Sequence, residues 1–355
     1  MSIQENISRL FDQDLLDKVR DFIESHNKYV VTVHMSADGD AVGSAVSFTR
    51  YLRAKGKQAT IVYNDQPGEN LSFIPGIKDH LVYEKNAVAP ALCQHDEAVK
   101  TIAECDAIIC LDYNALSRLG RLEEEIRKRD VPRLLIDHHL DPKVEEFSVL
   151  VSRPELSAAC EVVYRLILEL GDDDLVNKDI AEPIYCGMMT DTGQFVYNSE
   201  RKDIYLIVAH LLETGFNKEE LHRQFALEIE RRVRLKGYCL YHKMVVVPEH
   251  KAAYFSLSNI ELKRFNHQKG DSEGFVNIPL DIEGIQVSAF FREEKNFVKA
   301  SFRSKGDFPV NILAEKFFNG GGHKNAAGGE FMGSLQKAEA LFVKVLPLFD
   351  KYLDK

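Results

Sequence analysis

Residues 29–64, YVVTVHMSADGDAVGSAVSFTRYLRAKGKQATIVYN, decide the fold class of this chain. They contain an apolar run over residues 29–34, a helical pattern over residues 40–57 that ends near Gly56, and a second apolar run over residues 59–64. A strand, a helix and another strand in this order are typical of a parallel β-sheet covered by helices. We therefore predict an α/β fold with a parallel sheet for the first part of the chain.

The alternation of apolar runs and helical patterns continues, and then it changes. Further strands are predicted over residues 106–111 and 133–136, helices over 122–129 and 157–170, and a strand-like run over 184–189 that leads into a loop. Residues 218–243 form a charged helical stretch, after which shorter strands (252–257, 274–278, 285–292, 297–303) precede helices at 308–318 and 335–353. We predict an N-terminal domain over residues 1–217, a helical connector over 218–245, and a smaller C-terminal α/β domain over 246–355, with the active-site cleft between them.

Length and composition are those of an ordinary globular protein. The chain has 355 residues, of which 45% are hydrophobic and 28% charged, and at roughly 150 residues per domain this length suggests two domains. No stretch approaches the ~20 apolar residues of a bilayer span, and the acidic, amphipathic N-terminus is unlike a signal peptide. Six isolated cysteines without a CxxC pair indicate buried thiols in a reducing cytoplasm, and we expect a cytoplasmic protein: Cys93, Cys105, Cys110, Cys160, Cys186 and Cys239.

Charge is distributed unevenly along the chain. The net charge of −10 argues against a protein that holds long nucleic acid by releasing counterions. Residues 1–230 carry 25 Lys and Arg against 41 Asp and Glu, whereas residues 231–355 carry 20 against 14. An acidic first part suits cation binding and a basic second part suits an anionic ligand, although a chance difference between domains is an equal alternative.

Metal-competent side chains are predicted to follow four separate strands. They are His34, Asp38 and Asp40 after the first strand, Asp112 after residues 106–111, Asp137, His138 and His139 after residues 133–136, and Asp191 after residues 184–189. The carboxyl ends of parallel strands share one crevice, where ligands bind. Crowded carboxylates repel one another unless cations neutralise them, and a set of imidazole and carboxylate without thiolate favours Mn²⁺, Fe²⁺ or Mg²⁺. There are enough ligands for two ions.

Each of these features also has a simpler structural explanation. The DGD sequence of residues 38–40 is typical of a turn or a helix cap, a His-His pair is common on surfaces, and Asp112 suits an ordinary turn. It is their joint placement after strands of one predicted sheet that favours a metal site.

The motifs HMSADGDAVGS, LDYNALSRLG, IDHHLDP and MMTDTGQF resemble the four ordered motifs of the DHH phosphoesterases. GGGHKNAAGG at residues 320–329 resembles the signature of their DHH-associated C-terminal domain. The resemblance covers about residues 20–335. The two-domain form is similar to the nanoRNase/pAp phosphatases, which trim very short oligonucleotides and remove the 3′-phosphate of adenosine 3′,5′-bisphosphate (pAp).

The resemblance implies a role for each matching residue of the first domain. His34 and Asp38 would hold one metal ion, Asp40 and His138 the other, and Asp112 and Asp191 would be shared, with Mn²⁺ as the expected ion. His139 would face the substrate phosphate, and Asp137 would orient the histidine pair. The chain departs from the family pattern at Ser36 and Ala37, where many members carry Asn-Pro, but those side chains are not ligands.

The C-terminal motif predicts a grip on substrate phosphate. Gly320, Gly321 and Gly322 allow close backbone approach and present N–H groups beside His323, and residues 325–327 would open a helix or a tight turn. Arg303 resembles the family arginine that holds phosphate, for which a bidentate guanidinium is suited. Without the resemblance, a flexible loop and a solvated strand-end charge would be preferred here. Arg118 matches another motif position and is either structural or near the substrate.

Together these features predict a metal-dependent phosphoesterase that degrades short single-stranded RNA or DNA oligonucleotides of about 2–5 nucleotides and dephosphorylates pAp. A polyphosphatase or pyrophosphatase, a phosphodiesterase for linear or cyclic dinucleotides, and a non-catalytic nucleotide-binding regulator are the alternatives. We expect no membrane association and no stable complex with long nucleic acid. The sequence leaves the oligomeric state open, with a homodimer as one option.

Overall fold

The computed structural model describes residues 7–84, 94–227, 229–268 and 270–353, and Cys93 lies outside these ranges. The chain divides into two compact units, Met1–Ala226 and Leu227–Lys355, and this boundary falls inside the stretch predicted as a connector. The other five cysteines are buried and free, as the sequence predicts. None of the described helices combines the length and apolar character that a bilayer span requires.

The first unit is built on a six-stranded sheet in the order β3-β2-β1-β4-β5-β6, and every neighbouring pair is parallel. The α/β prediction is therefore confirmed. The strands are β1 (Lys28–Val33), β2 (Gln58–Tyr63), β3 (Leu81–Val82), β4 (Ala107–Leu111), β5 (Arg133–Asp137) and β6 (Val149–Ser152).

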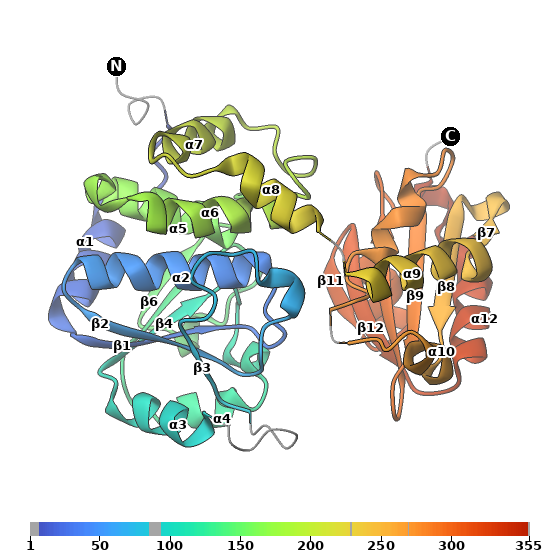
Figure 1. Cartoon of the computed structure of the whole chain (residues 1–355), viewed down its shortest axis with the longest axis horizontal. Coiled ribbons are helices and arrows are strands. Elements are labelled where there is room, and N and C mark those ends of the chain that lie inside the picture. The colour runs from blue at the N-terminus through green and yellow to red at the C-terminus, as the bar shows by residue number, and fades with distance from the viewer. Residues whose placement is uncertain (1–6, 85–93, 228, 269, 354–355) are drawn as a thin grey trace. The chain divides into compact units, whose positions relative to one another are not determined.

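Helices cover both faces of this sheet, as Figure 1 shows. One face carries α1 (Gln13–Ser25), α2 (Gly39–Ala54), α5 (Ala159–Glu169) and α6 (Lys178–Asp191), with α7 (Lys202–Glu213) and α8 (Lys218–Ala226) beyond them. The other carries α3 (His95–Glu104) and α4 (Leu122–Arg127). Alternate strand residues serve the two cores: Val31 packs with α2, whereas Val30 packs with α3. Both faces are buried, which is why these strands are almost uniformly apolar.

The second unit contains a mixed sheet in the order β11-β12-β10-β9-β8-β7. Its strands are β7 (Val245–Val247), β8 (Ala252–Leu257), β9 (Val287–Glu293), β10 (Val298–Ser304), β11 (Gly321–His323) and β12 (Ala326–Phe331), and its helices are α9 (Glu230–Tyr238), α10 (Asn259–Arg264), α11 (Val310–Phe317) and α12 (Leu335–Val345). β8 and β9 pair in parallel, and the other pairs are antiparallel.

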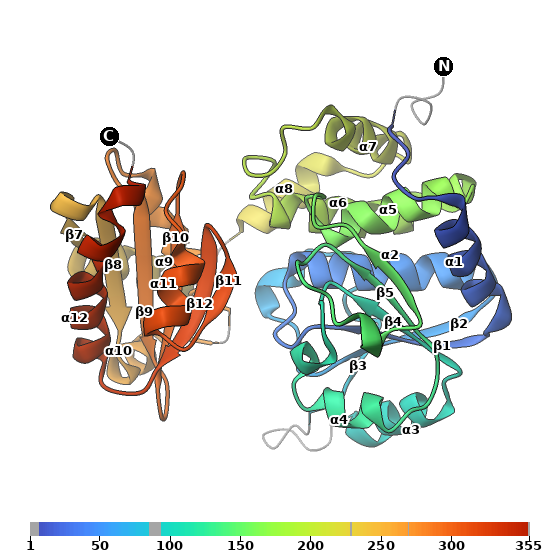
Figure 2. The same ribbon diagram turned by 180° about the vertical axis from the view of Figure 1, so that it is seen from behind.

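The two faces of the second sheet are covered differently. One face carries α11 and α12 (Figure 2). These helices pack on a cluster of phenylalanines that includes Phe291 and Phe302. On the opposite face, residues of α9 and of a 3₁₀ helix (Phe275–Asp281) cover the part formed by β8 and β9. The part of that face formed by β10, β12 and β11 remains accessible and carries exposed or half-buried residues.

Two local predictions are wrong. Residues 184–189 lie in α6 instead of a strand-like run, and residues 274–278 fall mostly in the 3₁₀ helix. Both segments are short apolar runs, which cannot be assigned to strand or helix from periodicity alone. Where a helix or a tight turn was predicted at residues 325–327, a turn at residues 324–325 leads into β12, and β11 lies antiparallel to β12 as a hairpin.

Candidate metal centre and C-terminal face

We use the name acid–histidine cluster for the eight residues that the sequence predicted at the strand ends of the first unit: His34, Asp38, Asp40, Asp112, Asp137, His138, His139 and Asp191. Within this unit, the elements bring all eight to one place, and interacting pairs among them lie between 2.7 and 3.9 Å apart.

His34 directly follows β1, and a backbone contact fixes the orientation of its ring. Its Nδ1 lies 2.9 Å from the carbonyl oxygen of Met35, which can only accept, so Nδ1 carries the proton. Its Nε2 lies 3.5 Å from Asp112 Oδ2 and 3.8 Å from Asp38 Oδ2. The imidazole is therefore prepared to bind a cation through Nε2.

Asp38 and Asp40 sit at the beginning of α2 and are held by backbone N–H groups. Asp38 caps the helix, because its Oδ1 accepts from the N–H groups of Asp40 and Ala41 at 3.1 and 3.0 Å. The helix-cap explanation of the DGD sequence is thus correct for Asp38, yet Oδ2 still faces His34. Asp40 is buried and accepts from the N–H groups of Ala159 and Cys160 at 2.6 and 2.9 Å, at the beginning of α5.

Asp112 lies at the middle of the cluster, directly after β4. It is almost completely buried, and its φ of +59° is in the left-handed region that Asp tolerates better than most residues. Oδ2 is 3.5 Å from His34 Nε2, and Oδ1 is 3.5 Å from His138 Nε2. Among the described residues, Oδ1 has no hydrogen-bond partner. A buried carboxylate oxygen without a partner, between two imidazoles, suits a bound cation.

The histidine pair follows β5, where Asp137 is the last residue of the strand. His138 Nδ1 lies 3.4 Å from the carbonyl oxygen of Leu156, and its Nε2 lies 3.7 Å from Asp191 Oδ2 and 3.9 Å from Asp40 Oδ2. His139 Nδ1 lies 2.7 Å from Asp137 Oδ1, and the Asp137 side chain is fully buried. Asp137 thus orients His139 directly.

Asp191 reaches the cluster from a helix, which corrects the prediction that it follows a strand. It is the last residue of α6, whose end is a Schellman motif: the Gly193 N–H donates to the carbonyl of Thr190 and the Gln194 N–H to that of Met189. Gly193 has the positive φ (+55°) that this motif needs. Gly193, which follows the apolar pattern after residues 190–192, was the sequence signal for a helix end.

Glycines allow α6 to approach α2 closely enough for Asp191 to reach the site. A Cβ on Gly187 would lie 2.8 Å from Asp40 Oδ1 and closer still to Cys160 Sγ. A Cβ on Gly43 would collide with the carbonyl oxygen of Pro183, and one on Gly39 with the side chain of Thr190. The beginning of α2 and the end of α6 can therefore lie side by side.

The cluster contains three overlapping groups in which the potential ligand atoms lie within 4.8 Å of one another: His34–Asp38–Asp112, Asp40–His138–Asp191, and Asp112–His138–His139. The first two match the ligand pairs expected from the sequence. Asp112 faces both histidines, one through each carboxylate oxygen. Asp191 groups with Asp40 and His138 alone, so its shared role is not evident from these distances.

Burial and mutual proximity shift the pKa values of the residues in the cluster. Burial and the nearby Asp112 raise the pKa of Asp40 to about 7, and burial with Asp40 raises the pKa of Asp191. Burial alone would lower the pKa of His34 and His138, but Asp112 outweighs it, so both pKa values are raised. For Asp112, burial is outweighed by the two histidines, and its pKa is lowered. A bound cation would balance the negative charge of the same carboxylates and would make the extra protons unnecessary.

In the second unit, strand register places Arg303 and His323 on one face of the sheet. Arg303 on β10 lies opposite Ala326 on β12, which lies opposite His323 on β11. Two strand spacings put their Cα atoms about 10 Å apart. Arg303 is partly buried and donates from Nη1 to the carbonyl oxygen of Phe302 at 2.9 Å, whereas His323 is exposed. We call this accessible part of β10, β12 and β11 the C-terminal face.

The three glycines of this motif differ in what requires them. A Cβ on Gly320 would collide with the Gly328 carbonyl oxygen, and Gly322 combines a φ of +140° with close approach to the Ala326 carbonyl. These two are required by the hairpin itself. Gly321 has open space where a Cβ would stand, and Gly328 opposite it meets only one atom, at 3.6 Å. The free space at Gly321 is therefore available to a ligand.

Arg118, the remaining predicted residue, is exposed in a 3₁₀ helix (Leu116–Leu119), and its carbonyl oxygen accepts from the N–H of Met35, next to His34.

The sequence did not reveal the backbone contact from Ala159 and Cys160 to Asp40. The only signal for it was a helix that begins after Ala158, whose side chain cannot cap.

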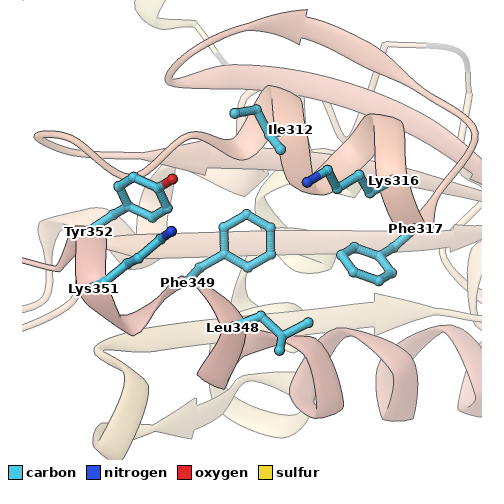
Figure 3. A pocket seen from close by; sticks show the side chains of 7 residues that line it. All are labelled: Ile312, Lys316, Phe317, Leu348, Phe349, Lys351 and Tyr352. Carbon is cyan, nitrogen blue, oxygen red and sulfur yellow. The ribbon is translucent and has the colours of Figure 1, made fainter.

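A surface pocket of about 160 Å³ in the second unit contains none of the predicted residues (Figure 3). It is lined by Ile312, Lys316, Phe317, Leu348, Phe349, Lys351 and Tyr352. This pocket is therefore separate from both the acid–histidine cluster and the residues of the C-terminal motif.

Comparison with known proteins identifies the family of both domains. Residues 28–188 match the N-terminal domain of the DHH family, and residues 251–346 match the DHHA1 domain. A solved structure of an exopolyphosphatase-related protein from Bacteroides fragilis is 38% identical, with a TM-score of 0.90 over 97% of this chain and 99% of that one.

Curated relatives named bifunctional oligoribonuclease and PAP phosphatase NrnA are also similar to the chain. The Bacillus subtilis protein is 27% identical over 86% of this chain and 90% of its own length. The Thermus thermophilus protein is 29% identical over 86% and 84%. Domain matches, fold and the motif residues agree, and the chain belongs to the DHH family, with a DHHA1 domain after its N-terminal domain.

Proposed function

We propose that the protein is a metal-dependent phosphoesterase that hydrolyses short oligonucleotides to mononucleotides and removes the 3′-phosphate of pAp. The observation that carries this proposal is the placement of Asp112, whose two carboxylate oxygens each face the Nε2 of a different histidine. One carboxylate between two imidazoles suits a pair of ions that share it.

The ligand assignment follows the two groups of the cluster. His34 and Asp38 would hold one ion, Asp40, His138 and Asp191 the other, and Asp112 both. Nitrogen and oxygen donors without thiolate fit Mn²⁺, and the nearby Cys160 thiol has a pKa raised by burial, so it is not a competing ligand. Bound in this way, two ions would activate water at neutral pH and stabilise charge on the reacting phosphate.

His139 has a role of its own in this proposal. Because Asp137 Oδ1 accepts from Nδ1, the remaining Nε2 of His139 can accept a proton or, once protonated, donate to an oxygen of the substrate phosphate. The buried Asp137 carboxylate holds the ring in this orientation. This pair therefore positions the phosphate and handles a proton beside the proposed ions.

The C-terminal face would hold the rest of the substrate. The guanidinium of Arg303 can bind a phosphate through two hydrogen bonds, and the open space at Gly321 allows the ligand to approach the backbone. The NrnA relatives, which carry oligoribonuclease and PAP phosphatase in their names, support nucleotides as the substrate class.

A second candidate substrate is inorganic polyphosphate or pyrophosphate. It is favoured by the name of the Bacteroides fragilis protein, which is described as exopolyphosphatase-related. The same proposed metal centre would suit either a phosphodiester or a phosphoanhydride.

Product analysis separates these candidates. The protein would be incubated in Mn²⁺ with labelled RNAs of two to twenty-four nucleotides, with pAp, and with pyrophosphate and polyphosphate, and the Asp112→Asn variant would control for contaminating enzymes. We expect mononucleotides from the shortest RNAs and AMP from pAp. Phosphate release from polyphosphate alone would favour the second candidate, and full activity in metal-free protein would refute the metal-dependent reaction.

A further inference from the structure

A buried ionic network lies directly behind Asp40, on the first turn of α5. Glu161 and Arg165 are completely buried, and Arg165 Nε donates to Glu161 Oε1 at 3.0 Å. Arg201 donates to the other oxygen, Oε2, at 2.6 Å. Arg165 also donates to Asp203 Oδ2 at 3.2 Å and to the carbonyl oxygen of Ser8 at 3.0 Å, so Glu161 is one member of a connected buried network. Removing the charge of Glu161 would weaken the contacts that hold both arginines.

Glu161 uses the same carboxylate to fix the start of its helix. Its Oε2 accepts from the backbone N–H of Ser157 at 3.0 Å and from Ser157 Oγ at 2.7 Å. This resembles a capping box displaced by one residue, since the N-cap residue of α5 is Ala158, which has no side chain able to accept. Although burial acts to raise the pKa of Glu161, Arg201 and Ser157 outweigh it and the pKa is lowered.

Asp40 supplies the cap that α5 lacks. The first two N–H groups of the helix, those of Ala159 and Cys160, donate to its two carboxylate oxygens. A helix N-terminus favours such a negative charge, and two donors from adjacent residues fix the plane of the carboxylate. The position of Asp40 therefore depends on the position of residues 157–160, which Glu161 holds.

We propose that Glu161 is a positioning residue for Asp40, and that it controls one of the two metal positions. This inference rests on the proposed function. Asp40 belongs to the group with His138 and Asp191, and its carboxylate is held by α5. His34 and Asp38 belong to the other group and are held by the carbonyl of Met35 and by N–H groups of α2. A less ordered start of α5 should weaken the binding of one ion and not of the other. The reason is that the described side-chain contacts of Glu161 are with Ser157, Arg165 and Arg201, and not with His34 or Asp38.

The test is a titration of metal-free protein with Mn²⁺ by calorimetry, together with a thermal unfolding curve for each variant. For Glu161→Gln, we expect one of two binding events to weaken by about 10–100-fold, the usual effect of losing an indirect partner of a ligand, while the other changes little. Arg201→Gln removes only the partly exposed arm of the network and should weaken the same event by a smaller factor.

Glu169→Gln provides a matched control on the same helix. Glu169 also accepts two backbone N–H groups, those of Leu10 and Phe11, but it lies at the far end of α5. This variant should lower the unfolding temperature and leave both binding events unchanged.

Several results would overturn the inference. These are unchanged Mn²⁺ binding in folded Glu161→Gln, equal weakening of both events, or the same weakening in Glu169→Gln. If Glu161→Gln does not fold, unchanged binding in Arg201→Gln would overturn it. A wild-type protein that binds no Mn²⁺ would instead refute the proposed function, so the two failures are distinguishable.

Discussion

In the acid–histidine cluster, hydrogen bonds to neighbouring groups fix the side chains that would bind an ion, whereas the C-terminal face leaves its polar groups accessible. His34 contacts a carbonyl oxygen, Asp38 and Asp40 accept from backbone N–H groups, and His139 contacts Asp137. On the C-terminal face, Arg303 donates to the carbonyl oxygen of the preceding residue, and His323 is exposed.

This difference corresponds to two different tasks. A site that must place reacting atoms needs each group within a fraction of an ångström, which supporting contacts provide. A surface that selects a flexible anionic ligand needs charge, open backbone and room. If this contrast is correct, small changes in the first region should affect the reaction severely, and similar changes in the second should mainly affect substrate binding.

The largest effect is expected for Asp112→Asn. Asn keeps the size of the side chain and tolerates the left-handed backbone of this position, but it removes the charge that both proposed ions would share. Losing several kcal/mol of charge stabilisation predicts a fall in kcat/KM of at least ~10³-fold. Steady-state kinetics on a dinucleotide would measure it, with circular dichroism as the folding control. A fall of less than tenfold would contradict a central role for Asp112.

Gly187→Ala should show that the spacing of α2 and α6 is as important as the ligands themselves. The added methyl group would overlap Cys160 Sγ and approach Asp40, so we expect the free energy of unfolding to fall by about 1–3 kcal/mol and Mn²⁺ binding to weaken. Denaturant unfolding and calorimetry would measure both.

The counterpart in the second region is Gly321→Ala. A Cβ there meets no atom within 4 Å, so the stability should remain within about 0.5 kcal/mol of wild type. If both variants are equally stable, the two regions do not differ in rigidity as we describe.

Arg303→Ala should separate substrate binding from chemistry. A charge-assisted phosphate contact contributes ~1.5–3 kcal/mol, so kcat/KM on a dinucleotide should fall about 10–100-fold, while metal content and hydrolysis of p-nitrophenyl phosphate change little. Arg303→Lys keeps the charge but not the fork of donors, and should recover only part of the loss. Equal slowing on both substrates would assign Arg303 to the reaction or the fold.

The smallest expected effect is a pH dependence of stability in metal-free protein. Groups whose pKa is raised by folding bind protons more tightly in the folded state, so they stabilise it at lower pH. The stabilisation by Asp40 is lost as the pH rises from 3.8 to its folded pKa of about 7, and the stabilisation by His34 and His138 is lost as the pH rises above their ordinary value of 6.5. Asp112, whose pKa is lowered, affects stability only in strong acid.

The unfolding temperature in EDTA should therefore fall from pH 6 to pH 8, by about 2–4 °C for each kcal/mol that the free energy of unfolding loses. Saturating Mn²⁺ should reduce this dependence, because an ion replaces the protons. An unfolding temperature that rises over this range in EDTA would show that the cluster does not hold the extra protons.

The strand ends of the first unit could be predicted from sequence because parallel strands leave a plain signature. His34, Asp112 and Asp137 each end or directly follow an apolar run, and the sheet brings such positions together without further information. Asp191 was placed after the wrong kind of element, because a buried helix and a buried strand are equally apolar. The prediction nevertheless placed it in the cluster, because the end of α6 reaches the same edge of the sheet as the strand ends do.

Contacts between distant segments could not be predicted in this way. The bonds from Ala159 and Cys160 to Asp40 join residues about 120 positions apart, and they depend on how α5 packs beside α2. Glu161 was unremarkable in sequence, since an acidic residue in a first helical turn is common. The hairpin of β11 and β12 was also missed, because consecutive glycines suit a loop as well as a paired strand.

The end of α6 has a consequence for local opening. Helix ends are usually the first parts of a helix to lose their hydrogen bonds. Here the segment after Asp191 folds back on the helix: the N–H groups of Val196 and Tyr197 both donate to the carbonyl of Thr192, and the Phe195 N–H donates to Thr192 Oγ1. Amide hydrogens in the last turn of α6 should therefore exchange as slowly as those in its middle, and Asp191 is carried by a helix end that does not fray.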